Sequence, residues 1–316
     1  MADLPTAADL ASFSLAAQHP LTRSWVDDPT RLALLEGEHA FDLQLATDLD
    51  LAAQRAEFLD VGQPAEAFLN RWVEVGPDLC VMLSIRFEGL DREKPFVDVS
   101  VTSRPLTPAE LPALRVAGLD GYGAFRPGRL RIWSAGPLDG WTAEVPGARP
   151  DMRVLAAPLA ELREREVPDE LTLRPTRDLT HHADAVAAYA AVDTKHPGHV
   201  GQARVIEEDA LQQVIEAGTM FDVLWKGRWS GYAGALPKPK HGLPAYSVQE
   251  LLLAPPARGH GLGPYLSTLL ARHLPDDGRV LSGTIHGENQ GARQAALRAG
   301  RHDVGGWAWV PLTKGA

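Results

Sequence analysis

The sequence predicts an α/β (α+β) protein of two domains, each a mixed, mostly antiparallel sheet flanked by helices. Three observations lead to this prediction. The 316 residues exceed the usual size of one domain and can bury two cores. Runs with apolar residues at helical spacing alternate with runs rich in Val, Ile and aromatic residues. A tight Gly227-Arg228 turn joins two of the strand-like runs, which is typical of antiparallel neighbours.

The first half of the chain begins with helical patterns and then changes to strands. Leu, Ala and Phe recur at helical spacing before residue 70, whereas Val, Leu and Ile dominate or alternate in period two after it. The expected helices are Ala7–Gln18, Asp28–Glu38, Leu51–Phe68 and Thr107–Val116. The expected strands are Arg71–Phe87, Pro95–Thr102, Arg129–Trp133 and Met152–Ala156.

A densely charged segment that ends at Pro168 separates the two halves, and a new strand pattern follows it. We therefore expect domains at 1–168 and 169–316. The expected strands of the second are Leu171–Arg174, Met220–Lys226, Trp229–Leu236, Ala245–Leu253, Val280–Ile285 and Gly305–Val310. The expected helices are Ala183–Val192, Glu207–Ala217, Leu262–His273 and Gln290–Ala299. Both halves run from helices to paired strands, then helix, then strand.

Composition narrows the class of protein. A net charge of −10 argues against a nucleic-acid partner and weakly favours a cationic or amine-bearing one. No apolar run is long enough for a membrane span and no signal pattern opens the chain, so we expect a cytoplasmic protein without a membrane partner. The single cysteine, Cys80, excludes an intramolecular disulfide. The histidines lack metal-ligand spacing, so we expect no metal site.

The most informative stretch is Leu251–Gly263. It contains an apolar run, two prolines and the pattern Arg-Gly-x-Gly-x-Gly, directly before a helical pattern. Glycines at alternate positions let backbone amides turn toward a bulky anion, and the helix N-terminus favours negative charge. The glycine spacing departs from the dinucleotide fingerprint, and Gly263-Pro264-Tyr265 lacks the Lys-Ser/Thr of a P-loop. The pattern therefore predicts an anion site of another kind.

Glu250–Gly263 resembles the acyl-CoA-binding motif of the GNAT N-acetyltransferase superfamily. Downstream, Thr284–Asn289 with Ala292 and Gly300 is similar to the strand, asparagine and short helix of that family. The resemblance covers about residues 171–311. It implies acetyl-CoA as the acyl-donor substrate, a primary amine on a small molecule or peptide as acceptor, and two strands that separate to admit the cofactor. The first domain would be a degenerate copy without the loop for the pyrophosphate.

The resemblance also implies roles for particular residues. The pantetheine would pair with the backbone of Leu251 and Leu253, and Asn289 would contact it or cap the following helix; both roles remain open. Arg258 would add charge at the edge of the pyrophosphate. The residues expected to surround the pyrophosphate are Arg258, Gly259, His260, Gly261, Leu262 and Gly263.

Glu250 is the expected general base, and the Leu253 amide the expected donor to the oxyanion. Many family members place a tyrosine as general acid where this chain has Ala296. His286 and Tyr265 are the alternative acids, although structural roles are open for both. The alternatives to an enzyme are an acyl-CoA-binding sensor or scaffold without turnover, and a nucleotide-binding protein of another fold. The acceptor and the oligomeric state stay undetermined.

Overall fold

The structure is a computed structural model that describes residues 3–136, 139–195 and 204–312. The chain forms two compact units. The first unit contains Met1–Asp151 and Gly305–Ala316, and the second unit contains Met152–Val304. The expected boundary at residue 168 divides the sequence differently. The reason is that two strands change unit along their length, β5 (Arg149–Pro158) and β11 (His302–Pro311).

The sheet of the first unit has the order β1-β2-β3-β4-β11. Its other strands are β1 (Arg71–Gly76), β2 (Leu79–Phe87), β3 (Pro95–Thr102) and β4 (Arg129–Ser134). Neighbours are antiparallel except for β3 and β4, which pair in parallel through Val97 with Leu130 and Asp98 with Arg131. The helices are α1 (Ala7–Ala16), α2 (Asp28–Thr47), α3 (Leu49–Leu59), α4 (Leu111–Tyr122) and α5 (Asp139–Glu144).

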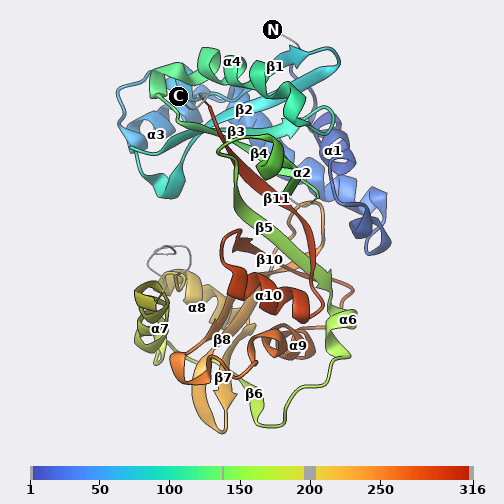
Figure 1. Ribbon diagram of the computed structural model, residues 1–316, viewed down its shortest axis with the longest axis vertical. Helices are drawn as coiled ribbons and strands as arrows, with labels where there is room; N and C mark the ends of the chain where they lie inside the picture. Colours follow the sequence, from blue (N-terminus) through green and yellow to red (C-terminus); the bar gives the residue numbers. More distant parts are fainter. Residues whose placement is uncertain (1–2, 137–138, 196–203, 313–316) are drawn as a thin grey trace. The chain divides into compact units, whose positions relative to one another are not determined.

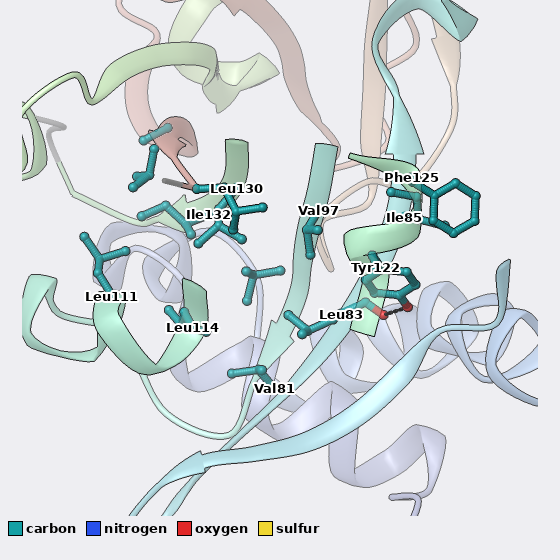
Figure 2. Close-up of a cluster of buried hydrophobic side chains, with 14 of the residues drawn as sticks. Val81, Leu83, Ile85, Val97, Leu111, Leu114, Tyr122, Phe125, Leu130 and Ile132 are labelled. Carbon is teal, nitrogen blue, oxygen red and sulfur yellow. Dashed lines mark hydrogen bonds between the residues drawn. The ribbon is translucent and has the colours of Figure 1, made fainter. Parts of the chain in front are cut away.

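The core of the first unit lies between its sheet and the helices α3 and α4. Figure 2 shows Val81, Leu83 and Ile85 of β2 facing apolar side chains of α4 and β4, all of them buried. These β2 residues alternate along the strand, so one face of the strand carries this core. Within the same cluster, the Tyr122 hydroxyl lies 2.8 Å from the carbonyl oxygen of Leu69 and 2.9 Å from that of Leu83, and it shares its proton between them.

Two of the expected elements of the first unit are divided in the structure, and the helices expected over Asp28–Glu38 and Thr107–Val116 instead span Asp28–Thr47 and Leu111–Tyr122. The helix expected over Leu51–Phe68 ends at Asp60, which adopts a left-handed conformation with φ of 44°. The strand expected over Arg71–Phe87 is instead a hairpin of β1 and β2, because the chain turns at Pro77-Asp78. Proline has no N–H for a sheet ladder, and aspartate tolerates the positive φ of 58° that the turn requires.

The sheet of the second unit has the order β5-β10-β9-β8-β7-β6. Its remaining strands are β6 (Leu171–Pro175), β7 (Met220–Trp225), β8 (Arg228–Pro237), β9 (Ala245–Leu253) and β10 (Val280–His286). Only β9 and β10 pair in parallel. The structure therefore confirms a mixed α/β fold with mostly antiparallel strands.

Helices cover both faces of this second sheet. The helices are α6 (Leu159–Arg163), α7 (His182–Lys195), α8 (Glu208–Glu216), α9 (Gly263–His273) and α10 (Gln290–Arg298). One buried cluster joins α6 and α9 to the sheet, and another joins α7 and α8 to it. Helix α6 occupies the start of the charged segment that is expected to separate the two domains. It is fixed there because Leu159 and Leu162 are buried.

The pairing pattern of the first sheet recurs in the second. The series β1-β2-β3-β4-β11 and β7-β8-β9-β10-β5 have the same order of antiparallel and parallel pairs. Each series also has one extra residue, a β-bulge, in its third strand: Ser100 in β3 and Gln249 in β9. When β3 and β9 are aligned at these bulges, Val101 of the first unit occupies the position of Glu250 of the second.

Within the described residues, none of the helices combines the length and the apolar character that crossing a membrane requires.

We expect Tyr122→Phe to lower the stability of the protein by about 1–2 kcal/mol, because it leaves buried carbonyl oxygens without their donor. The shift of the urea midpoint measures this loss. Val116→Ala, an exposed position on the same helix, serves as the control and stays within about 0.5 kcal/mol of the wild type. Equal midpoints for Tyr122→Phe and the wild type would show that the hydroxyl adds nothing.

Candidate functional site

The two parallel strands of the second unit separate partway along their length. β9 pairs with β10 only from Ala245 with Val280 to Ser247 with Ser282. Beyond these pairs, β9 remains bonded to β8 as far as Leu253, and β10 to β5 as far as His286. We call the unpaired stretches Val248–Leu253 and Gly283–His286 the splay; its closed end lies at Ser247 and Ser282. Both strands thus keep one sheet neighbour and leave their facing edges unpaired.

The backbone of β9 directs alternate residues toward the splay. A Cβ atom added to Gly231 of β8 would lie 1.9 Å from the carbonyl oxygen of Leu252, so that carbonyl points at β8. Because successive residues of a strand point their peptide groups to opposite edges, those of Leu251 and Leu253 point toward the splay. The family resemblance implies that the backbone of these two residues would pair with pantetheine.

The glycine loop follows β9 at the open end of the splay. Gly259 and Gly261 both adopt left-handed conformations, with φ of 80° and 72°. Left-handed residues at alternate positions turn successive N–H groups toward one concave side, which suits an anion. Helix α9 then begins at Gly263, and its N-cap residue Leu262 offers no side-chain acceptor to the first amides. A Cβ atom on Gly263 would lie 3.2 Å from that of Ala295, so α9 packs closely on α10.

Arg258 holds the glycine loop to its surroundings. Its Nε donates to the carbonyl oxygen of Leu253 at 2.7 Å, and its Nη2 to that of Ala188 in α7 at 2.9 Å. These two donors therefore anchor the loop to β9 and α7. His260 is exposed, and its ring centroid lies 4.5 Å from that of Trp225.

Glu250 lies on the opposite face of β9 from α9 and is almost completely buried, with 2% of its surface exposed. The hydroxyl of Tyr189 donates to its Oε2 at 2.7 Å, and the amide of Ile206 donates to its Oε1 at 2.8 Å. Burial raises the pKa of Glu250 to about 7, although both hydrogen bonds act to lower it. A carboxyl group with this pKa can accept a proton near neutral pH, as a general base must.

The bulge at Gln249 sets the direction of the Glu250 side chain. In a regular strand with Gln249 paired like its neighbours, Val248 and Glu250 would lie on the same face of β9, since side chains alternate; the bulge puts them on opposite faces. Val248 and Leu251 instead pack with the α9 cluster, whereas Glu250 and Leu252 face α7. The sequence could not reveal this reorientation, because the bulge is defined only by pairing with β8.

The remaining candidates make local contacts. Nδ1 of His286 lies 3.3 Å from the amide of Glu288, which donates to it. The guanidinium carbon of Arg165 lies over the ring of Tyr265, on α9, at 5.6 Å from the ring centroid. Oδ1 of Asn289 accepts from the amide of Ala292 at 3.1 Å, which is the N-cap role left open by the sequence.

Sequence reasoning did not identify Tyr189 or the amide of Ile206 as partners of Glu250. Both precede it by more than forty residues, so no local pattern indicates the contact. It also assigned no role to Arg301, which is a buried guanidinium beside the splay. The sequence signal that could have identified Arg301 is its place directly after Gly300, the glycine that ends a helix.

Among the described residues, no group of three or more His, Cys, Asp and Glu side chains is arranged to hold a metal ion.

No protein-family description and no curated protein matches the sequence. Solved structures of GNAT acetyltransferases are similar to the chain. A GNAT-family acetyltransferase from Colwellia psychrerythraea has 12% identity, 84% coverage of this chain and 96% of its own, and a TM-score of 0.47. A GCN5-related N-acetyltransferase from Kribbella flavida has 16% identity, coverages of 84% and 94%, and a TM-score of 0.45.

A tandem GNAT protein from the clavulanic acid biosynthesis pathway is also similar, with 12% identity, coverages of 86% and 98%, and a TM-score of 0.39. At these identities and TM-scores the neighbours do not identify a substrate or a mechanism. We therefore take the function from the splay, the glycine loop and Glu250.

We expect Glu250 to make the stability of the protein depend on pH. Its folded pKa of about 7 lies above the ordinary value of 4.5, so the folded state holds the proton more tightly and the stability falls as pH rises between these values. Glu250→Gln removes this dependence. The free energy of unfolding of the variant minus that of the wild type therefore increases by about 3 kcal/mol from pH 4 to pH 8.

Urea unfolding at a series of pH values measures this difference. Glu161→Gln, which removes an exposed carboxylate of the same unit, is the control for the loss of one surface charge. A difference between Glu250→Gln and the wild type that stays constant with pH would contradict the raised pKa.

Proposed function

We propose that the protein is an N-acetyltransferase that moves an acetyl group from acetyl-CoA to a primary amine of a small-molecule or peptide acceptor in the cytoplasm. The observation that carries the proposal is the splay. Two adjacent strands that each leave one backbone edge unpaired need an extended partner with amide groups. Pantetheine has such groups, and the glycine loop at the open end suits the pyrophosphate to which pantetheine is joined.

The lengths and positions are consistent with this donor. Val248–Leu253 spans about 17 Å at the usual rise of a strand, enough for an extended pantetheine arm. With the pyrophosphate at Gly259–Gly263, the arm would run along Leu253 and Leu251 toward the closed end. The thioester would then lie near Glu250, beyond the middle of the splay.

Glu250 would remove a proton from the ammonium group of the acceptor, so that the nitrogen can attack the thioester carbonyl. The hydrogen bonds from Tyr189 and Ile206 fix its orientation, and burial gives it a pKa near the pH at which it must act. The Leu253 amide, the donor expected from the resemblance, lies about 10 Å along β9 from Glu250, and the Leu253 carbonyl is bonded to Arg258. The Leu251 amide also points toward the splay and lies next to Glu250, so it is our candidate donor to the oxyanion.

We infer that the first unit is a degenerate copy of the second. Its sheet repeats the same pairing pattern, but Val101 stands where Glu250 would be, and the segment before α4 has no glycine-rich loop. With neither a base nor an anion loop, the first unit would not perform this chemistry by itself. Its role would then lie in support of the second unit.

An acyl-CoA-binding protein without turnover is the second candidate. The observation that favours it is Ala296, which is buried on α10 where many family members carry the general acid. Both candidates require CoA binding, and they differ in whether an amine is consumed.

We expect Gly261→Val to weaken acetyl-CoA binding at least tenfold, because a β-branched residue at φ of 72° costs about 1–2 kcal/mol and turns the loop amides away. Isothermal titration calorimetry measures the affinity. Gly278→Val imposes the same strain, at φ of 74°, in an exposed turn before β10, and it is expected to leave the affinity unchanged. Wild-type protein that binds ATP or NAD but not acetyl-CoA would refute both candidate functions.

If the protein is an enzyme, its kcat/KM for an amine that it acetylates is expected to rise with pH and to level off above about pH 7, as Glu250 loses its proton. Glu250→Gln should lower kcat about 100-fold or more and abolish this pH limb, with the affinity for acetyl-CoA retained. Thiol release on a panel of amines provides the assay. An unchanged pH profile in the variant would exclude Glu250 as the base, and thiol release by no amine would favour the binding protein.

A further inference from the structure

Arg301 is a buried cation with unpartnered donors. It follows Gly300, which ends α10 in a left-handed conformation, and only 4% of its surface is exposed. Its Nε and Nη1 atoms are buried and have no hydrogen-bond partner within residues 3–136, 139–195 and 204–312. Burial lowers the pKa of Arg301 to about 10, and among the residues that the structure describes no charged group offsets this effect. A guanidinium at this pKa still carries its charge at neutral pH.

The guanidinium lies at the closed end of the splay. A Cβ atom on Gly283 would lie 3.2 Å from Nη1 of Arg301 and 3.0 Å from Cβ of Val248. Gly283 and Val248 are the first residues of β10 and β9 beyond the paired segment. Arg301 therefore reaches the point where the strands separate, on the α9 face, and glycine at 283 leaves it room to do so.

The carboxylate nearest along the chain does not neutralise this charge. Asp303 accepts hydrogen bonds from Nε and Nη2 of Arg153 at 3.0 and 2.6 Å, and from Nη2 of Arg293 at 3.3 Å. Two arginines thus share Asp303, which leaves Arg301 without an acidic partner. An unpaired buried charge is costly, and a bound anion with hydrogen-bond acceptors would remove that cost.

We propose that Arg301 binds the sulfur anion that leaves acetyl-CoA during acetyl transfer. This inference rests on the proposed function and identifies the group that acts on the leaving thiolate. The phosphates of the same substrate would bind at the glycine loop, about 17 Å away at the open end of the splay, so they cannot be the anion at Arg301. The thiol is at the other end of the pantetheine arm, where the strands meet.

The proposed step balances as follows. The acceptor nitrogen, after losing a proton to Glu250, attacks the thioester carbonyl carbon and forms the C–N bond. The C–S bond then breaks and its electron pair goes to sulfur, while the nitrogen loses its second proton to solvent. The guanidinium keeps its own protons and stabilises the sulfur anion by charge and by hydrogen bonds from Nε and Nη1. The thiolate takes a proton from water on release.

In this step Arg301 acts on the leaving group in place of the tyrosine that many family members carry at the position of Ala296. The amide of Arg301 donates to the carbonyl oxygen of Ala296 at 3.0 Å, so the two residues lie together at the end of α10. A tyrosine at 296 would supply a proton, whereas a guanidinium supplies a fixed positive charge. The chain can therefore lack that tyrosine and still stabilise the leaving group.

The test is a titration of the thiol of bound CoA in the wild type, Arg301→Met and Arg301→Lys. The ultraviolet absorbance of the thiolate follows the titration, and a matched titration with desulfo-CoA subtracts the tyrosines of the protein. In the wild type, the thiol pKa is expected to fall by about one unit or more below that of CoA in solution, and in Arg301→Met this decrease is lost. Arg301→Lys should retain part of it.

Two further measurements separate this role from a structural one. The Kd for CoA is expected to agree within about threefold among the three proteins, since the phosphates contribute most of the contacts. With a turned-over amine, Arg301→Met should lower kcat about 100-fold with little change in KM. Thermal unfolding should show that Arg301→Met is folded, because it replaces a buried charge by an apolar chain of similar length.

Equal thiol titrations in the wild type and in folded Arg301→Met would overturn this inference and leave the proposed function intact. The same holds if Arg301→Met loses activity only with carboxylate-bearing acceptors, because the guanidinium would then bind the acceptor. Failure of the wild type to bind CoA would instead refute the proposed function, and this inference with it.

Discussion

The separation of β9 and β10 after Ser247 and Ser282 is the constraint on which the site depends. A strand inside a sheet normally has both edges bonded, and an unpaired peptide group shielded from water is unfavourable. Here each strand keeps one neighbour, β8 or β5, and these outer pairings hold the two facing edges apart. The glycine loop, Glu250 and Arg301 are all placed by reference to this separation.

Two buried ionisable groups lie on opposite faces of the separated strands. Glu250 faces α7, where burial favours its neutral form, and Arg301 lies on the α9 face with its charge retained. A reaction that takes a proton from one reactant and leaves negative charge on another needs these two properties on the two sides of the reacting bond. The sheet itself keeps the groups from neutralising one another.

Much of this site is readable from sequence because its signals are local. The alternate glycines, the strand that carries Glu250 and the asparagine that caps α10 are all defined by neighbours within a few residues. The partners of Glu250, the bulge at Gln249 and the position of Arg301 depend on strand pairing, which no local pattern encodes. The domain boundary also depends on strand pairing, because β5 and β11 each begin in one unit and end in the other, away from the charged segment that ends at Pro168.

The course of β5 and β11 has a consequence for synthesis of the chain. A ribosome makes the first unit's strands β1 to β4 before the second unit, but β11, which pairs with β4 along Gly306–Pro311, follows the second unit. The nascent first unit therefore has an open sheet edge at β4 while the rest of the chain is being made. Proteins usually fold domain by domain from the N-terminus during synthesis. This chain can complete its first sheet only after translation of its second unit.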